Sequence, residues 1–469
     1  MSVLPLRMVK LTCMILLSCY LVAVAQAEDQ SKPNFIIIFC DDQGYNDLGC
    51  FGSKTIKTPN IDQLASEGRK FTNFYVPCSV CSPSRAGLLT GCYPKRVGMQ
   101  KHVLFPKSDY GLHPNELTIA DHLKTIGYAT ACVGKWHLGH LPELLPRQQG
   151  FDSYYGIPYS NDMNHPDNKN KPKLTSDERW INQASAVTHW NTPLVGNEEI
   201  IELPVDQRTI TRRYTDKAIE FVKANKDTPF FLYLPHSMPH IPLYVPEDVY
   251  DPDPQNAYTC VIEHIDAEVG RLANTVRELG LADNTYIIYT SDNGPWLQFK
   301  NHGGSALPLR SGKGTTFEGG QRVPCVMWAP GRIPAGTSTD AFSSTMDLLP
   351  TIAALTNSTL PETRIDGFDI SSTLTTDTTP RNELVFYSAR GDLEGIRLGD
   401  WKFLEITKTN RKNKTSQTET YLFNLADDIG EQNNLLKSNP QKVAELKARM
   451  KAVDQEVTAN SRPVWRKPK

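Results

Sequence analysis

The strongest constraint on the fold is a repeated pattern in which a short apolar run, rich in β-branched residues, ends in a group of polar residues. Five such runs, separated by helical patterns or long connections, lie at residues 34–39, 71–76, 129–134, 230–234 and 285–291. Continuous apolar runs are typical of strands buried on both faces of a parallel sheet. The pattern predicts an α/β fold, with a mostly parallel sheet sandwiched by helices.

The segments between these runs contain clear helical patterns. The longest covers residues 257–279, where apolar residues repeat at helical spacing and Gly280 follows as a stop signal. A further strand at 323–328 and a further helix at 347–355 complete the alternating region.

The sequence changes in character near Pro380. Four short strand patterns joined by turns, followed by a helical pattern at 441–453, predict a small antiparallel sheet with a packing helix. We therefore expect an α/β domain at 33–378 and a C-terminal α+β subdomain at 379–469.

Charge and the N-terminal sequence narrow the class of protein. A net charge of -2 over 469 residues, without a basic tail, argues against nucleic-acid binding. Arg7 and Lys10 precede the apolar run 11–24, and Ala25-Gln26-Ala27 follows as a cleavage site with small residues. This order is typical of a secretory signal peptide, residues 1–27, so we expect an exported protein, periplasmic, secreted or lysosomal according to its host. Apolar residues continue past Cys19, which argues against lipid anchoring there, and no other segment approaches the length of a transmembrane helix.

Two strand ends carry oxygen ligands. Asp41 and Asp42 follow the first strand, and Asp292 and Asn293 follow the fifth. An exposed turn would explain each pair separately. However, the carboxyl ends of parallel strands meet at one edge of a sheet, where ligands of such folds gather. An oxygen-rich set at this edge suits a hard cation such as Ca²⁺ or Mg²⁺.

The helical pattern after the second strand begins with a cysteine. Ser82 is expected to cap this helix and Pro83 to occupy its first position, with Arg85 about one turn after Cys81. The helix dipole and its free N–H groups favour an anion there. The same pattern fits a capped helix with a buried thiol or, together with Cys78, a redox Cys-x-x-Cys pair, although the proline and arginine have no role in redox chemistry. Eight cysteines follow the signal peptide, and their pairing stays open.

Basic residues also gather at strand ends and in one glycine-rich loop, 303–320. They are Lys135, His137, His240 and Lys313. Each could be an ordinary surface residue, and the glycine spacing before Lys313 does not match a nucleotide-binding P-loop. Together with Arg85 and a cation, they would form a pocket for a tetrahedral oxyanion.

Four motifs resemble those of the type I, formylglycine-dependent sulfatases, in the branch of arylsulfatase A and N-acetylgalactosamine-6-sulfatase. The motifs are Cys81-Ser82-Pro83-Ser84-Arg85-Ala86-Gly87-Leu88-Leu89-Thr90-Gly91, Gly134-Lys135-Trp136-His137-Leu138-Gly139, Ser291-Asp292-Asn293-Gly294-Pro295 and Gly312-Lys313-Gly314-Thr315-Thr316-Phe317-Glu318-Gly319-Gly320. The likeness extends from Asn34 to about Leu435. It implies a sulfuric ester hydrolase with an alkaline-phosphatase-like α/β fold and a smaller C-terminal subdomain, whose loops close one side of the pocket.

The resemblance also implies a modified residue and a metal. In the family, the cysteine matching Cys81 is oxidised by a formylglycine-generating maturation enzyme to an aldehyde, which hydrates to a geminal diol. A divalent cation, usually calcium with magnesium as the alternative, is held by the residues matching Asp41, Asp42, Asp292 and Asn293. Gln43 stands where many relatives place another metal-shell residue, but this branch relies on the other four.

Each basic residue has an implied role as well. One diol oxygen attacks sulfur, and the alcohol leaves with a proton from the residue matching His240 or Lys313. The residue matching His137 then takes the proton of the second diol hydroxyl, so that sulfate is eliminated and the aldehyde returns. Arg85 would steady the diol, and Lys135 would bind sulfate oxygens.

The substrate is expected to be a sulfated glycan or an aryl sulfate. Residues 156–162 resemble the same branch, in which the serine matching Ser160 contacts the sulfate. They lie in a polar stretch, 150–212, that is expected to form irregular, substrate-facing loops. Two alternatives remain open: phosphonate or phosphodiester hydrolysis, and a secreted glycan-binding protein whose Cys81 is not converted.

Overall fold

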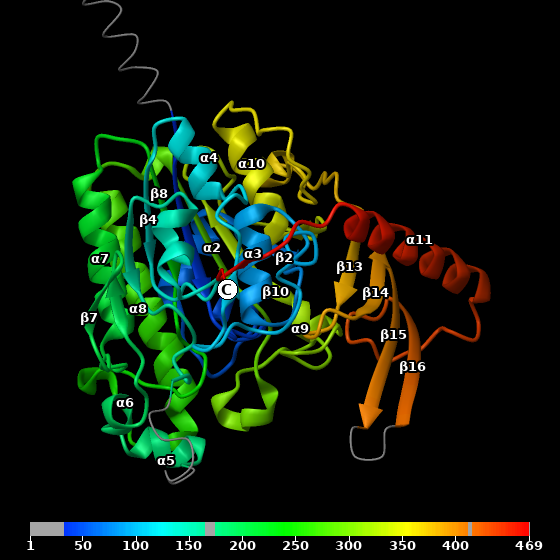
Figure 1. Ribbon diagram of the computed structural model, residues 1–469, viewed down its shortest axis with the longest axis horizontal. Coiled ribbons are helices and arrows are strands. Elements are labelled where there is room, and N and C mark those ends of the chain that lie inside the picture. The colour runs from blue at the N-terminus through cyan, green and yellow to red at the C-terminus, as the bar shows by residue number, and fades with distance from the viewer. Residues whose placement is uncertain (1–31, 165–173, 411–414, 469) are drawn as a thin grey trace, which may run out of the picture.

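The structure is a computed structural model that describes residues 32–164, 174–410 and 415–468. A large sheet sandwiched between helices occupies most of these residues, and a smaller sheet with one long helix lies beside it (Figure 1). This architecture confirms the predicted α/β sheet with a small C-terminal antiparallel sheet. The expected signal peptide, 1–27, lies outside the described residues.

The large sheet of the described residues has eleven strands, and nine of them run in one direction. In spatial order the strands are β11 (Thr337–Thr339), β2 (Arg69–Tyr75), β10 (Arg322–Trp328), β9 (Thr285–Ser291), β1 (Asn34–Cys40), β8 (Phe230–Pro235), β4 (Ala129–Val133), β5 (Ser153–Gly156), β6 (Leu194–Gly196) and β7 (Glu199–Glu202), with β12 (Ser343–Ser344) beside β2. Strands β9, β1, β8, β4 and β5 are parallel neighbours. Strand β2 shares their direction because β10 is antiparallel to both β9 and β2. The carboxyl ends of these six strands therefore meet at one edge.

Both faces of the sheet are buried, because successive residues of a strand point to opposite sides. Along β1, Ile36 and Ile38 belong to one hydrophobic core, whereas Phe35 and Ile37 belong to the other, and all four are fully buried. The helices that supply the first core are α2 (Pro59–Glu67), α7 (Ile210–Ala224) and α8 (Ala257–Glu278). Those of the second core are α3 (Cys81–Thr90), α4 (Ile119–Thr125) and α10 (Leu348–Leu355). Burial on both faces explains why the strands read as continuous apolar runs.

The segment 150–212 differs in part from the expected irregular loops, because β5, β6 and β7 extend the large sheet. These strands have three or four residues each, too few to form a recognisable apolar run. Two short helices also lie here, α5 (Ser176–Ile181) and α6 (Ser185–Thr188).

The remaining short elements are connections. They are α9 (Glu318–Gln321), β3 (Tyr110–Gly111), η1 (Gly49–Phe51), η2 (Pro142–Leu144), η3 (Pro146–Gln149), η4 (Glu247–Val249), η5 (Pro254–Asn256), η6 (Ala282–Asn284), η7 (Leu297–His302), η8 (Thr345–Asp347) and η9 (Ser371–Leu374). None of the helices in the described part of the chain combines the length and the apolar character needed to cross a membrane.

The C-terminal sheet is antiparallel throughout and shares its core with the large sheet. Its strands, in order, are β13 (Glu383–Tyr387), β14 (Leu393–Leu398), β15 (Trp401–Asn410) and β16 (Thr415–Asn424), and α11 (Pro440–Ala459) packs against them. Their hydrophobic core includes Tyr75, Phe342 and Met346 from the α/β part. The chain then returns to that part, where β17 (Trp465–Arg466) pairs with β3. The two sheets are therefore tied together at more than one place.

Candidate active site

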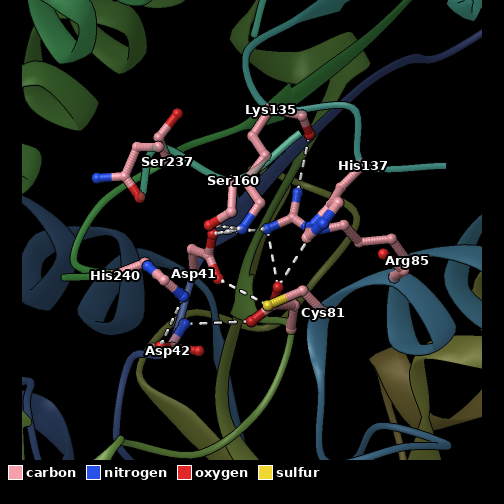
Figure 2. Close-up of polar contacts among 12 residues, drawn as sticks. Asp41, Asp42, Cys81, Arg85, Lys135, His137, Ser160, Ser237 and His240 are labelled. Carbon is pink, nitrogen blue, oxygen red and sulfur yellow. Dashed lines mark hydrogen bonds and ion pairs between the residues drawn. The ribbon is translucent and has the colours of Figure 1, made fainter. Parts of the chain in front are cut away.

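The predicted site residues lie together at the carboxyl edge of the large sheet (Figure 2). They follow β1, β2, β4, β5, β8 and β9, and one more comes from the loop before α9. In chain order they are Asp41, Asp42, Cys81, Arg85, Lys135, His137, Ser160, His240, Asp292, Asn293 and Lys313. Figure 2 shows Lys135 and Ser160 approaching Asp41, with Cys81 beside it and His240 near Asp42. One sheet edge thus gathers residues from distant parts of the chain.

Cys81 is the first residue of α3 and is 1% exposed. The prediction that Ser82 caps this helix is wrong: the cap position is Val80, and the Ser82 hydroxyl instead accepts a hydrogen bond from the Leu104 N–H at 3.0 Å. The Cys81 Sγ atom lies 3.3 Å from Asp41 Oδ1 and 3.6 Å from Lys313 Nζ. Burial, and then the charge of Asp41, raise the pKa of the thiol well above its ordinary value. The side chain therefore stands between an anion and a cation as a neutral thiol.

The described cysteines are unpaired in the structure. They are Cys40, Cys50, Cys78, Cys81, Cys92, Cys132, Cys260 and Cys325. Cys78 and Cys81 form no disulfide, and burial raises the pKa of the Cys78 thiol to about 12. A redox pair needs a thiol that ionises readily, so this geometry does not favour the redox alternative.

Two site residues have backbone conformations that are unusual for non-glycine residues. The φ angles of Asp42 and His137 are 66° and 60°, in the left-handed region. Such conformations are unfavourable and cluster at functional sites, where the surrounding structure holds them. Both occur just after strands, at the points where the chain turns across the sheet edge.

Buried oxygen atoms form the part of the site that could hold a cation. Asp292 Oδ1 accepts a hydrogen bond from the Asp42 N–H at 3.1 Å, and Asp42 Oδ1 accepts one from Asn293 Nδ2 at 2.8 Å. The amide oxygen of Asn293 is buried and has no hydrogen-bond partner among the described residues. Burial, and then the charge of Asp41, raise the pKa of Asp292 to about 7. Crowded carboxylates with an unpartnered amide oxygen fit a hard divalent cation.

The donor atoms that lie closest together form a slightly different set from the predicted ligands. Single ligand atoms of Asp41, Asp42, Cys81 and His240 all lie within 4.8 Å of one another. Asp292 joins this set through the Asp42 N–H and through Arg85. The candidate cation position is therefore adjacent to the sulfur atom of Cys81.

Two cations are buried behind the carboxylates. Arg85 donates to Asp292 Oδ2 from Nε at 3.1 Å and from Nη2 at 2.8 Å, and from Nη1 to the Lys135 carbonyl oxygen at 2.9 Å. Lys135 contacts Asp41 and donates to Ser160 Oγ at 3.2 Å. Burial alone would raise the pKa of Asp41, but Lys135 and the other nearby cations hold it well below its ordinary value. This arrangement offers fixed N–H donors to an oxyanion.

The two histidines have different hydrogen-bond arrangements. The His137 Nε2 atom lies 2.9 Å from the Leu104 carbonyl oxygen, which assigns the ring proton to Nε2 and leaves the buried Nδ1 without a partner among the described residues. Burial, and then Lys135 and Arg85, lower the pKa of His137 well below its ordinary value. His240 Nδ1 lies 2.6 Å from the Ile241 carbonyl oxygen, and its Nε2 faces Asp42 Oδ2 at 3.7 Å. His137 therefore has one ring nitrogen without a partner in the described part of the chain, whereas His240 is held by the backbone of the next residue, Ile241.

Trp296 belongs to the site but was not identified from the sequence. The Lys313 Nζ atom lies 4.3 Å from the centroid of its ring, and the His240 ring centroid lies 5.3 Å away. Trp296 directly follows Ser291-Asp292-Asn293-Gly294-Pro295, and this adjacency was the only signal in the sequence.

The comparisons with known proteins agree with this geometry. The family model described as Sulfatase matches residues 33–358. Arylsulfatase A of Homo sapiens is 38% identical over 427 residues, which cover 86% of this chain and 83% of that protein. N-acetylgalactosamine-6-sulfatase of Sus scrofa is 36% identical over 393 residues, which cover 81% of this chain and 72% of that protein.

A solved structure is similar over nearly the whole length of both chains. The crystal structure of Ps i-CgsB in complex with k-i-k-neocarrahexaose has a TM-score of 0.77 and 32% identity, covering 92% of this chain and 94% of that one. The resemblance based on the four motifs is thus confirmed. The chain belongs to the sulfatase family: it is a sulfuric ester hydrolase with the alkaline-phosphatase-like fold.

Proposed function

We propose that this sulfatase hydrolyses sulfate esters of carbohydrates with a formylglycine made from Cys81 and a bound divalent cation. The observation that carries the proposal is the position of Cys81, buried at the start of α3 with Asp41 at 3.3 Å and Lys313 at 3.6 Å. A thiol buried beside a carboxylate is a poor nucleophile. Conversion of Cys81 would place an aldehyde at the same point, between the cation site and the Lys313 ammonium. In water this aldehyde would hydrate to a diol.

The cation would be held by Asp41, Asp42, Asp292 and Asn293. Their oxygen donors fit Ca²⁺, with Mg²⁺ as the alternative, and the unpartnered Asn293 oxygen supports a ligand at this point. When bound, the cation would polarise the sulfate, and the formylglycine diol would supply the oxygen that attacks sulfur.

The other side chains would bind sulfate and move protons. Lys135 and Ser160, which are already hydrogen-bonded to each other at 3.2 Å, would bind sulfate oxygens. Arg85 lies on α3, and its hydrogen bonds to Asp292 would fix the position of this carboxylate relative to the start of the helix. The free Nδ1 of His137 would accept the proton whose removal releases sulfate.

The proton for the departing alcohol would come from Lys313 or His240, and the hydrogen bonds favour Lys313. An ammonium has three N–H donors, and that of Lys313 already lies near the Cys81 sulfur. His240 directs its Nδ1–H to the Ile241 carbonyl oxygen, which leaves Nε2 as an acceptor in the neutral ring. His240 would then act mainly by binding the substrate.

Sulfated carbohydrates are the proposed substrates because the names of two similar proteins refer to carbohydrates. One relative is named N-acetylgalactosamine-6-sulfatase, and another was crystallised with a neocarrahexaose. We also propose export by the signal peptide 1–27, conversion of Cys81 by a maturation enzyme of the host, and division of the remaining chain into a catalytic domain at 33–378 and a subdomain at 379–469.

Mass spectrometry of the peptide that contains Cys81, from protein made in its native host, tests the modification. We expect a formyl group in place of the CH2SH group. The variant Cys81→Ala should keep the fold and lose turnover of an aryl sulfate to below detection, because the attacking oxygen is absent. Cys78→Ala, which removes a second buried thiol three residues upstream, is the matched control and should retain turnover.

Three results would overturn the proposal. An unmodified thiol in active enzyme would exclude formylglycine, and turnover by Cys81→Ala would exclude Cys81 as the source of the nucleophile. Much faster hydrolysis of an aryl phosphodiester than of the aryl sulfate would contradict the substrate class.

A further inference from the structure

A buried ionic cluster joins the C-terminal sheet to the loop that carries Lys313. Its members are Glu318, Lys402 and Glu431, and all three are 0% exposed. The Lys402 Nζ atom lies 2.8 Å from Glu318 Oε1 and 3.0 Å from Glu431 Oε1. Lys402 is on β15 and Glu431 follows β16, whereas Glu318 begins α9, shortly after Lys313. Figure 1 shows α9 near the lower end of β14, and the Thr316 hydroxyl, two residues before α9, donates to Glu394 Oε2 of β14 at 2.9 Å.

Glu431 contacts both ends of this loop. Its carboxylate binds the backbone N–H of Glu318 at one end, and its carbonyl oxygen binds the side chain of Arg310 at the other. Its Oε2 atom accepts a hydrogen bond from the Glu318 N–H at 2.7 Å. Its carbonyl oxygen accepts one from Arg310 Nη1 at 2.8 Å. The Arg310 guanidinium also lies 4.0 Å from the ring centroid of Phe317. The two ends of the segment 310–318 are therefore fastened to one residue of the C-terminal part.

The same segment touches the active site at its middle. The Lys313 N–H donates to the Pro295 carbonyl oxygen at 2.9 Å, and the Gly314 N–H donates to the Ser79 carbonyl oxygen at 2.9 Å. The backbone here is tightly folded, since a Cβ atom on Gly320 would meet the Thr315 carbonyl oxygen at 2.1 Å. A shift of Glu318 would therefore displace Lys313, because the chain between them has little room to change its conformation.

We propose that Lys402 and Glu431 are positioning residues that set the place of the Lys313 ammonium, so that the C-terminal sheet contributes to catalysis. The inference rests on the proposed role of Lys313. Buried ion pairs add little net stability, because the loss of hydration offsets most of the attraction, but they do require one geometry. Burial raises the pKa of Glu318, yet Lys402, Arg322 and Arg397 outweigh it and lower this pKa to about 2, so Glu318 is charged.

A double-mutant cycle tests this inference. Lys402→Met is made in the otherwise unchanged protein and again with Lys313→Ala. Both kcat and KM are measured on an aryl sulfate with a weakly acidic phenol, whose departure needs the proton assigned to Lys313, at enzyme concentrations high enough to measure residual turnover. Lys402→Met should lower kcat about tenfold and change KM less than about threefold. With Lys313→Ala present, the same change should lower kcat less than about twofold, because the group it positions is gone.

The matched control is Lys408→Met. Lys408 is on the same strand and pairs with Glu419 at 2.9 Å, but its side chain is 66% exposed, so its loss should leave kcat unchanged. If Lys402→Met does not accumulate as folded protein, Glu431→Gln takes its place in the same cycle. An equal loss of kcat in both backgrounds would overturn the inference and show a merely structural role. If Lys313→Ala alone leaves kcat unchanged, the proposed role of Lys313 fails instead.

Discussion

At the scale of single residues, Asn293 illustrates how the site is prepared for a ligand. Its amide nitrogen is committed to Asp42 at 2.8 Å, and its buried oxygen has no partner among the described residues. An unsatisfied buried acceptor is unfavourable by about 1 to 3 kcal/mol. A cation that this oxygen helps to bind would recover that free energy and neutralise the neighbouring carboxylates.

Removal of divalent cations should therefore destabilise the protein. With a chelator we expect the thermal midpoint to fall by on the order of 2 to 5 °C and to recover with added Ca²⁺, because ligands that bind only the folded state raise its stability. The recovery should be absent in Asn293→Ala, measured by calorimetry. Asn161→Ala is the control, since Asn161 is also fully buried and its amide oxygen has no hydrogen-bond partner in the part of the chain that the structure describes. A calcium response in Asn293→Ala equal to that of the control would contradict the ligand assignment.

His236 determines part of the acid stability. It is 0% exposed, and neither ring nitrogen has a hydrogen-bond partner among the described residues. Burial, and then the nearby His264, lower its pKa from 6.5 to about 3. The folded protein therefore keeps His236 neutral over a pH range in which the unfolded chain binds a proton.

The free energy of unfolding should thus fall as the pH drops from 6.5 toward 3, and His236 has no effect above this range. At pH ~4.5 His236 should lower the free energy of unfolding by about 2 to 3 kcal/mol relative to its value at neutral pH. His236→Phe should flatten the dependence of the urea midpoint on pH below ~6.5. His264→Phe should do the same to a smaller degree, since burial lowers the pKa of His264 only to about 4. If the urea midpoints of the variants and of the parent protein depend on pH in the same way, this explanation is contradicted.

At the scale of elements, the site depends on how closely β4 and β5 approach where they end. A Cβ atom on Gly156 would lie 1.7 Å from the Gly134 carbonyl oxygen. Gly134 itself has a φ of 137°, which side chains rarely adopt. Lys135 follows one strand and Ser160 the other, so the close approach brings these two residues within hydrogen-bond distance.

Gly156→Ala should separate the two strand ends. We expect a loss of about 2 to 3 kcal/mol in the free energy of unfolding, because a backbone atom must move, and a lower kcat/KM because Ser160 moves away from Lys135. Gly196→Ala on β6 is the control: its Cβ atom would first meet the exposed Ile201 side chain at 3.3 Å. That change should cost less than about 1 kcal/mol. Equal losses of unfolding free energy in the two variants, measured by urea denaturation, would show that the close approach of β4 and β5 is unimportant.

At the scale of the whole molecule, the last residues of the chain hold the two sheets together. After α11, Arg462 binds Glu116 of the α/β part through Nε at 2.8 Å and Nη2 at 2.7 Å. Their side chains are 28% and 5% exposed. Strand β17 then pairs with β3 of the α/β part. The C-terminal sheet is therefore fixed on both sides, which the positioning of Lys313 requires.

Arg462→Met should lower the free energy of unfolding by about 1 to 2 kcal/mol, because it leaves a buried carboxylate without its bidentate partner. Arg466→Met provides the comparison. Arg466 is 64% exposed and lies 3.7 Å from Asp109, so its loss should change stability by at most about 0.5 kcal/mol. Urea midpoints measure both effects, and an equal shift in the two variants would contradict the importance of the Arg462 contact.

Much of the fold could be predicted because it depends on local patterns. The runs at 34–39 and 285–291 correspond to β1 and β9, and the helical pattern at 257–279 corresponds to α8. Strands β5 to β7 were missed because three or four residues carry too little periodicity. The cap predicted at Ser82 was wrong because the Ser82 hydroxyl accepts a hydrogen bond from the Leu104 N–H, a contact that exists only in the folded chain.

The sequence by itself determined the α/β class, the order of the elements and the residue types at the strand ends, since these follow from local composition and motifs. Only the tertiary structure decided which atoms meet. The unpartnered oxygen of Asn293, the free Nδ1 of His137 and the ionic cluster around Lys402 depend on side chains that are far apart along the chain. Their contacts are set by packing in three dimensions, to which a one-dimensional pattern gives no access. The same is true of Cys81: its motif identified it, but packing placed it between Asp41 and Lys313.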